Sequence, residues 1–134
     1  MIYVLDSSAM IALANNESGA DVVASLLNDL RHECCAHAIN LCEVYYDALR
    51  RSSELQASNI ITELAGLGVI ERCDFDTVFW QHVGRLKALH RRVSLADCCA
   101  LALTLRVGGE LVTSDHHELD ALVAAGVCSI QFFR

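Results

Sequence analysis

The sequence predicts an α/β fold, a three-layer sandwich in which a central parallel sheet of about five strands is flanked by helices. Short apolar runs alternate along the chain with segments whose apolar residues have helical spacing. The runs are continuously apolar, which is typical of strands buried on both faces of a parallel sheet. With 134 residues, the chain is long enough for one core and too short for two, so we expect a single domain over residues 1–134.

The first half of the chain alternates strands with amphipathic helices. Its expected elements are, in order, a strand at residues 2–5, helices at 7–15 and 19–31, a strand at 34–38, helices at 39–51 and 53–67, and a strand at 69–72. Each strand is a short apolar run, and each helix carries apolar side chains three and four residues apart. Gly66 and Gly68 mark the end of the fourth helix.

The second half continues the same alternation. Its expected elements are helices at 75–90 and 94–107, a strand at 110–113, a helix at 118–125 and a strand at 128–133. The helix that begins at Ser94 is apolar nearly all round, so we expect it to be buried. Gly108 and Gly109 stop this helix, and Gly126 stops the next one.

The composition is that of an ordered protein, with 54% hydrophobic and 20% charged residues. The longest apolar stretches, such as residues 98–105, are well short of the roughly 20 residues needed to cross a membrane. The N-terminal segment has no basic leader, and Asp6 interrupts its apolar run, so we expect a cytoplasmic location. The formal net charge of -7 is opposite to that of a general nucleic-acid binder, although a metal site that gathers acids accounts for part of it.

The chain contains seven cysteines, an odd number, and no two of them have the C-x-x-C spacing. Zinc fingers and disulfide frameworks are therefore disfavoured. We expect most of the cysteines to be small buried side chains, because free cysteine packs like a small hydrophobic residue.

Four acids are expected at one edge of the sheet. Asp6 follows the first strand and Asp115 follows the fourth, so both lie at the carboxyl ends of parallel strands, where α/β folds place their ligands. Asp97 lies in the first turn of the long apolar helix, and Glu43 lies in the first turns of the helix after the second strand. Each acid also has a purely structural explanation. Asp6 and Asp115 suit helix N-caps, Asp97 completes a capping-box pattern, and Glu43 suits a solvated surface.

Together, the four carboxylates predict a divalent metal site. Carboxylates held close together repel one another, and a cation among them removes the conflict. Oxygen ligands without His or Cys at chelating spacing favour the hard ions Mg²⁺ or Mn²⁺. The chemistry that suits such a site is hydrolysis of a phosphodiester by a metal-activated water.

Four short motifs carry these acids: V-L-D-S-S at 4–8, I-N-L-C-E-V at 39–44, L-A-D at 95–97 and T-S-D at 113–115. Their order and the elements around them resemble the PIN-domain family, in particular its VapC-like toxins, along essentially the whole chain. The resemblance implies a PIN-like fold and a Mg²⁺- or Mn²⁺-dependent endoribonuclease whose catalytic metal ligands are Asp6, Glu43, Asp97 and Asp115. It also makes Ser8 and Thr113 supporting polar residues on the substrate side of the site.

The resemblance implies partners as well: an RNA substrate, a second copy in a homodimer, and a small VapB-like antitoxin that occupies the active-site groove. This chain departs from the family at T-S-D-H-H-E-L, where many relatives have a Phe shortly after the last acid. The departure leaves Glu118 and Asp120 as further acids whose role the sequence does not define.

Basic and histidine side chains lie near the expected site. Arg91 and Arg92, with His90, form a short basic cluster that can bind RNA phosphates, although positive charge at a helix C-terminus explains them equally well. His116 and His117 follow the last acid and can contact a phosphate, but a solvated first helical turn is the better explanation, because metal-assisted hydrolysis needs no histidine.

Two other functions compete with a ribonuclease. A receiver-like phosphoacceptor domain also gathers acids at the edge of a parallel sheet, but it needs a Lys beyond a late strand, and the only Lys of this chain, Lys87, lies in an expected helix. The other is a PIN-type domain that binds protein without cleaving RNA. The presence of all four acids argues against it.

Overall fold

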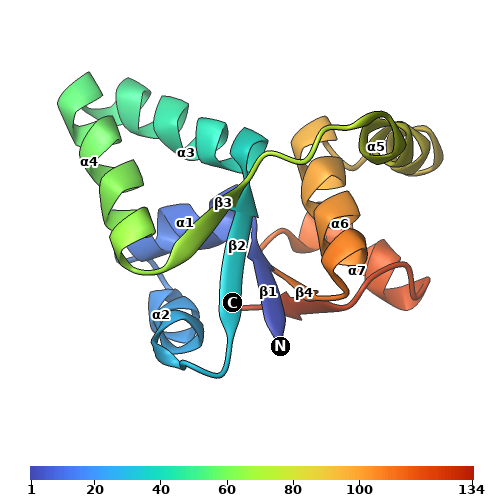
Figure 1. Cartoon of the computed structure of the whole chain (residues 1–134), viewed down its shortest axis with the longest axis horizontal. Coiled ribbons are helices and arrows are strands. Elements are labelled where there is room, and N and C mark those ends of the chain that lie inside the picture. Colours follow the sequence, from blue (N-terminus) through green and yellow to red (C-terminus); the bar gives the residue numbers. More distant parts are fainter.

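The structure, a computed structural model, describes residues 1–134 and has the expected α/β sandwich architecture (Figure 1). Its five strands are β1 (Ile2–Leu5), β2 (Glu33–His37), β3 (Val69–Arg72), β4 (Glu110–Thr113) and β5 (Ile130–Phe132). Its seven helices are α1 (Ser7–Ala14), α2 (Ala20–Asn28), α3 (Ala38–Arg51), α4 (Glu54–Gly66), α5 (Thr77–Leu89), α6 (Leu95–Val107) and α7 (His116–Ala124). None of the helices has the length and apolar character required to span a membrane.

The strands form one parallel sheet in the order β3-β2-β1-β4-β5. The chain therefore builds outward from β1 to β3 and then crosses back to place β4 on the other side of β1. In open α/β sheets the ligand crevice lies where the strand order reverses, here at the carboxyl ends of β1 and β4. The receiver-like alternative is wrong, because receiver domains have the strand order 2-1-3-4-5.

Helices cover both faces of the sheet, with α1 to α4 on one side and α5 to α7 on the other (Figure 1). Neighbouring strand residues alternate between the two cores: Leu5 and Val112 belong to the first, and Val4 and Leu111 to the second. Because both faces are covered, every position of the inner strands faces a core, which explains their continuously apolar sequences.

The cysteines are mostly packing residues, as expected. Cys34 and Cys35 are neighbours on β2 and lie in the two opposite cores. Cys98 and Cys99 are buried in the first turns of α6. All seven cysteines are free, but Cys42 and Cys73 are exposed and depart from the expectation.

Several helix boundaries differ by one to three residues from those expected, and two of these differences arise from aspartate side chains. Helix α2 ends three residues early, because Asp29 is extended and its carboxylate accepts hydrogen bonds from the backbone and guanidinium groups of Arg31. Helix α7 begins two residues early, because the Asp115 carboxylate accepts a hydrogen bond from the backbone N–H of Glu118 at 3.0 Å. The second difference bears on the site, because it sets the direction of Glu118.

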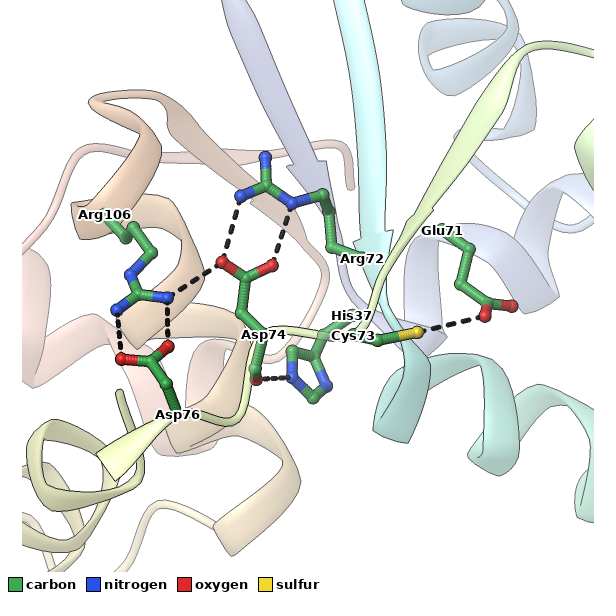
Figure 2. A network of polar contacts seen from close by, with 7 residues as sticks. All are labelled: His37, Glu71, Arg72, Cys73, Asp74, Asp76 and Arg106. Atoms are coloured by element: carbon green, nitrogen blue, oxygen red, sulfur yellow. Dashed lines mark hydrogen bonds and ion pairs between the residues drawn. The ribbon is translucent and has the colours of Figure 1, made fainter. Parts of the chain in front are cut away.

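The connection from β3 to α5 is held by a network of charged groups (Figure 2). The Asp74 carboxylate accepts from Arg72 Nε at 2.8 Å and from Arg106 Nη1 at 3.0 Å. Arg106 also pairs with Asp76, and the Asp74 carbonyl oxygen lies 2.8 Å from His37 Nε2. The hydrogen bond from Arg72 lowers the pKa of Asp74 to about 2. The network fixes the segment that carries the chain from one face of the sheet to the other.

Candidate metal centre

The carboxyl ends of β1 and β4 lie side by side at the reversal point of the sheet. The register pairs Leu5 with Val112, so the next residue, Asp6, lies opposite Thr113. Asp115 follows β4 by two residues and is the N-cap of α7. Strand pairing therefore brings together two acids that are more than 100 residues apart in the sequence.

Asp6 is only 2% exposed and is held by three donors. Its Oδ1 accepts from Ser8 Oγ at 2.6 Å and from the Ala9 backbone N–H at 2.9 Å, and its Oδ2 accepts from Thr113 Oγ1. Asp6 is thus the N-cap of α1, as its structural explanation predicted. Burial raises the pKa of Asp6 above its ordinary value, and the charge of Asp115 adds to the effect.

Ser8 and Thr113 connect the acids to the backbone around them. The Thr113 hydroxyl donates to Asp6 and accepts from the Asp115 backbone N–H at 3.0 Å. The Ser8 hydroxyl donates to Asp6 and accepts from the Ser114 backbone N–H at 3.0 Å. Thr113 is fully buried, so it lies out of contact with a substrate and acts by positioning Asp6 and Asp115.

Three carboxylates form the centre of the site: Asp97, Asp115 and Glu118 each offer an oxygen atom, and these atoms lie within 4.8 Å of one another. We call these residues the acidic triad. Asp115 caps α7, which places Glu118 in the first turn of that helix. The sequence left the role of Glu118 open, and the structure brings it beside Asp97 of α6.

The capping-box explanation of Asp97 does not hold. Ser94 caps α6, because its hydroxyl accepts from the Asp97 backbone N–H at 3.1 Å. The return bond of a capping box would join the Asp97 carboxylate to the Ser94 backbone N–H. That N–H instead donates to Glu118 Oε2 at 3.2 Å. The Asp97 carboxyl group, in a residue only 8% exposed, is therefore not a capping group.

The electrostatics of the acidic triad favour a cation. Burial raises the pKa of Asp97, a hydrogen bond with Glu118 raises it further, and the charges of Asp6, Glu118 and Asp115 add to the rise. The same hydrogen bond lowers the pKa of Glu118. The two pKa values shift in opposite directions because these neighbouring carboxyl groups repel each other when both are charged. A divalent cation would remove this repulsion, and the all-oxygen donor set fits a hard ion.

Glu43 lies outside the acidic triad, although the sequence grouped it with the other acids. Its Oε1 accepts from Asn40 Nδ2 at 3.3 Å, and the same amide lies 3.3 Å from the carbonyl oxygen of Ala96, next to Asp97. Glu43 is thus held close to the start of α6. Asn40 is fully buried, and its Oδ1 has no hydrogen-bond partner. Asn40 was not expected at the site, because polar residues of an amphipathic helix usually face solvent.

The remaining expected site residues lie around the triad. Arg91 and Arg92 are exposed in the connection between α5 and α6. His116 lies next to Asp115, but both of its ring nitrogens are engaged, Nδ1 with Asp120 at 3.0 Å and Nε2 with the Arg134 carbonyl oxygen at 2.8 Å. These contacts give His116 a local structural role, and Asp120 stays outside the triad.

Solved structures share this fold at low sequence identity. VapBC2 from Rickettsia felis, bound to a DNA fragment from its promoter, aligns with a TM-score of 0.75 and 14% identity over 98% of both chains. VapBC-1 from nontypeable Haemophilus influenzae aligns with a TM-score of 0.72 and 22% identity over 99% of this chain and 98% of the other. The toxin VapC20 of Mycobacterium tuberculosis, which cleaves the sarcin-ricin loop, aligns with a TM-score of 0.66 and 18% identity over 83% of this chain and 87% of its own.

Sequence comparison assigns the family. No curated protein sequence matches the chain significantly. The family model described as the PIN domain matches residues 3–124, which include the acidic triad and Asp6. The structural neighbours are toxin-antitoxin proteins of the VapBC type with the same fold. The chain belongs to the PIN domain family.

Proposed function

We propose that this PIN domain is an endoribonuclease that uses Mg²⁺ or Mn²⁺. The observation that carries the proposal is the acidic triad at the crevice of the sheet. One oxygen atom from each of its three carboxylates lies within 4.8 Å of the other two. Asp97 is buried and the other two are partly exposed, and carboxylates this close together repel one another unless a proton or a cation lies between them. PIN domains of the VapC type are nucleases, and a triad of this kind suits metal-assisted hydrolysis of a phosphodiester.

Each residue of the site has a distinct part in this proposal. Asp97, Asp115 and Glu118 are placed to hold the cation. A bound Mg²⁺ or Mn²⁺ supplies a water of lowered pKa and neutralises the charge that develops on the phosphate. Asp6 retains the ligand role that the family resemblance implies, and its three donors fix its orientation beside the triad. Glu43 retains the ligand role that the family resemblance implies, with its carboxylate held from α3 beside the start of α6.

The toxin role is the second part of the proposal. Structural neighbours come from VapBC complexes, and one of them is a toxin that cleaves the sarcin-ricin loop. We infer that this chain is the toxin of such a pair, a cytoplasmic homodimer with RNA as its substrate and a VapB-like antitoxin as its partner. Expression of the protein alone should arrest growth, and co-expression with a small protein encoded next to it should restore growth.

An apolar pocket supports a protein partner at this site. The pocket, of about 590 Å³, lies between the start of α3 and the start of α6 and includes Glu43 in its lining. Ile39, Tyr46, Phe75 and Leu95 contribute apolar surface to it, and all four are exposed. Apolar side chains of an antitoxin would fill this pocket and cover the acids next to it. The same surface would serve a PIN domain that only binds protein, so the cleavage assay must separate the two.

The cleavage assay uses purified protein with single-stranded and structured RNA, in Mn²⁺ or in EDTA. We expect cleavage only with Mn²⁺. The cleavage rate of Asp97→Asn should be at least about 100-fold lower than that of the wild type. A bound metal ion stabilises the transition state by several kcal/mol, and about 1.4 kcal/mol corresponds to a tenfold change in rate. Asp21→Asn, which changes an exposed aspartate of α2, is the matched control and should keep its activity. Cleavage that persists in EDTA or in Asp97→Asn contradicts the metal mechanism.

A further inference from the structure

A second pocket lies beside the acidic triad and is lined by basic side chains. It has a volume of about 260 Å³ and is bounded by His90, Arg91 and Arg92 from the α5–α6 connection and by His117 from α7. Glu118 also lines it, so the pocket adjoins the triad through a shared wall. We call it the basic pocket. It is separate from the apolar pocket, which lies toward α3.

The arginines of the basic pocket differ from most cationic side chains of the chain. Of ten Lys and Arg residues, six arginines form ion pairs with carboxylates: Arg31, Arg50, Arg51, Arg72, Arg106 and Arg134. The single lysine donates to two backbone carbonyl groups. The side chains of Arg85, Arg91 and Arg92 make no hydrogen bond or ion pair. Two of these three unpaired cations therefore line one pocket, in a protein whose net charge is -7.

The turn that carries the two arginines is held in place. The Val93 backbone N–H donates to the His90 carbonyl oxygen at 3.0 Å, which closes a turn with Arg91 and Arg92 at its tip. Val93 is 2% exposed and anchors the turn in the core. Lys87 Nζ donates to the carbonyl oxygens of Arg91 at 2.9 Å and Val93 at 2.7 Å. The backbone of the turn is thus ordered before any ligand arrives, which lowers the entropic cost of binding.

We propose that the basic pocket binds a phosphate group of the RNA next to the cleaved bond, not the cleaved phosphate itself. The inference rests on the proposed function, which places the cleaved phosphate at the acidic triad. Guanidinium groups bind phosphate through paired hydrogen bonds, and two adjacent arginines with no protein partner are suited to this role. A protein this acidic repels RNA over most of its surface, so the pocket also directs the strand into the crevice.

The test separates substrate binding from chemistry by measuring KM and kcat for cleavage of a short single-stranded RNA. Arg91→Ala/Arg92→Ala should raise KM at least about tenfold with kcat within about twofold, because each charged hydrogen bond contributes up to a few kcal/mol. Arg91→Lys/Arg92→Lys should have a KM between those of the wild type and the alanine double variant. Lysine keeps the positive charge but cannot form the paired hydrogen bonds of a guanidinium group. Arg85→Ala, which removes an unpaired arginine outside the pocket, is the matched control and should leave KM unchanged.

Two further measurements locate the bound phosphate. Removing one phosphate contact should reduce the slope of log KM against log salt by about 0.7. A series of RNAs each carries one uncharged methylphosphonate linkage, at a different position in each RNA. At one position the arginine substitutions should no longer raise KM, and this linkage should flank the cleaved bond. The proposal is overturned if the double variant has the KM of the wild type, if Arg85→Ala weakens binding equally, or if the linkage found is the cleaved one.

A binding experiment keeps this inference distinct from the proposed function. The fluorescence anisotropy of labelled RNA is measured at low salt with Asp97→Asn, in which the triad is weakened, with and without the two arginine substitutions. Loss of binding only when the arginines are replaced supports the phosphate pocket even if no cleavage is ever detected. Equal binding by both proteins overturns the pocket even if the enzyme cleaves RNA.

Discussion

Asp97 is the residue whose chemistry distinguishes a functional site from a structural one. Asp6 and Asp115 both cap helices, so their conformations have a structural reason. Asp97 lies in a helix whose cap is Ser94, and its carboxyl group has no capping bond. A buried acid with three acidic neighbours destabilises the folded protein when no cation is present. The position of Asp97 is best explained by a cation that its carboxylate binds.

We predict that Asp97 makes the metal-free protein less stable as the pH rises. Its folded pKa is raised, so above about pH 4 the folded state keeps a proton that the unfolded state has lost. The free energy of unfolding therefore falls with rising pH until the pH passes the raised value. In EDTA at neutral pH, Asp97→Asn should be more stable than the wild type, by roughly 1 kcal/mol or more, because asparagine removes the charge that burial and the neighbouring acids disfavour.

Urea unfolding in EDTA across the pH range checks this prediction. Part of the pH slope should remain in Asp97→Asn, because burial also raises the pKa of Asp6. Asp21→Asn, which changes an exposed side chain, should follow the wild-type curve. An Asp97→Asn protein that is less stable than the wild type at neutral pH would mean that Asp97 is a structural residue.

At the level of strands and helices, the ends of the parallel strands predicted the positions of two acids. Asp6 and Asp115 were placed correctly from the sequence, because a residue after a parallel strand must emerge at the carboxyl edge. The position of Glu118 was not predicted, because the expected helix began at this residue. In the structure Asp115 is the N-cap, so α7 begins two residues earlier, at His116. The motif Asp-x-x-Glu at 115–118 was the available signal, since an N-cap and an acid three residues later share one helical turn.

Asn40 shows a different limit of sequence reasoning at the same scale. Periodicity places a residue on the polar side of a helix without saying what that side meets. In the structure, Asn40 is buried because α3 meets the start of α6, and its amide contacts Ala96, 56 residues later in the chain. A contact across that sequence distance depends on how two helices pack and is not encoded in either helix alone.

The network that holds the β3–α5 connection provides a test at this scale. Because hydrogen bonding to Arg72 lowers the pKa of Asp74 to about 2, Asp74 contributes stability above about pH 4, and this is lost as the pH falls toward 2. Asp74→Asn should lower the free energy of unfolding at neutral pH by about 1 kcal/mol. The effect is no larger because the arginine partners are partly exposed and solvent screens their ion pairs. Urea denaturation at several pH values measures the difference in the free energy of unfolding between the wild type and Asp74→Asn. This difference should become smaller below pH 4.

The matched control for this variant is Arg50→Gln, which removes an exposed arginine from a 3.8 Å ion pair with Asp47. Surface pairs of this kind contribute little, so its stability should stay within about 0.5 kcal/mol of the wild type. Equal losses in Asp74→Asn and Arg50→Gln would show that the network has no special part in fixing the connection.

For the whole molecule, the sequence predicted the layers but not the order of the strands. Continuous apolar runs required helices on both faces, and that expectation is confirmed. Strand order depends on which edge of β1 each later strand joins, and local periodicity does not contain that information. The order matters to function, because the reversal between β1 and β4 brings Asp6 and Asp115 together.

A divalent cation bound by the acidic triad is the central element of the proposed site, and calorimetric titration with Mn²⁺ measures its binding directly, without RNA. We predict saturable binding to the wild-type protein, weakened at least about tenfold in Asp97→Asn and in Glu118→Gln, and unchanged in Asp21→Asn. Wild-type affinity in both triad variants, or no binding to the wild-type protein, would contradict the proposed metal centre.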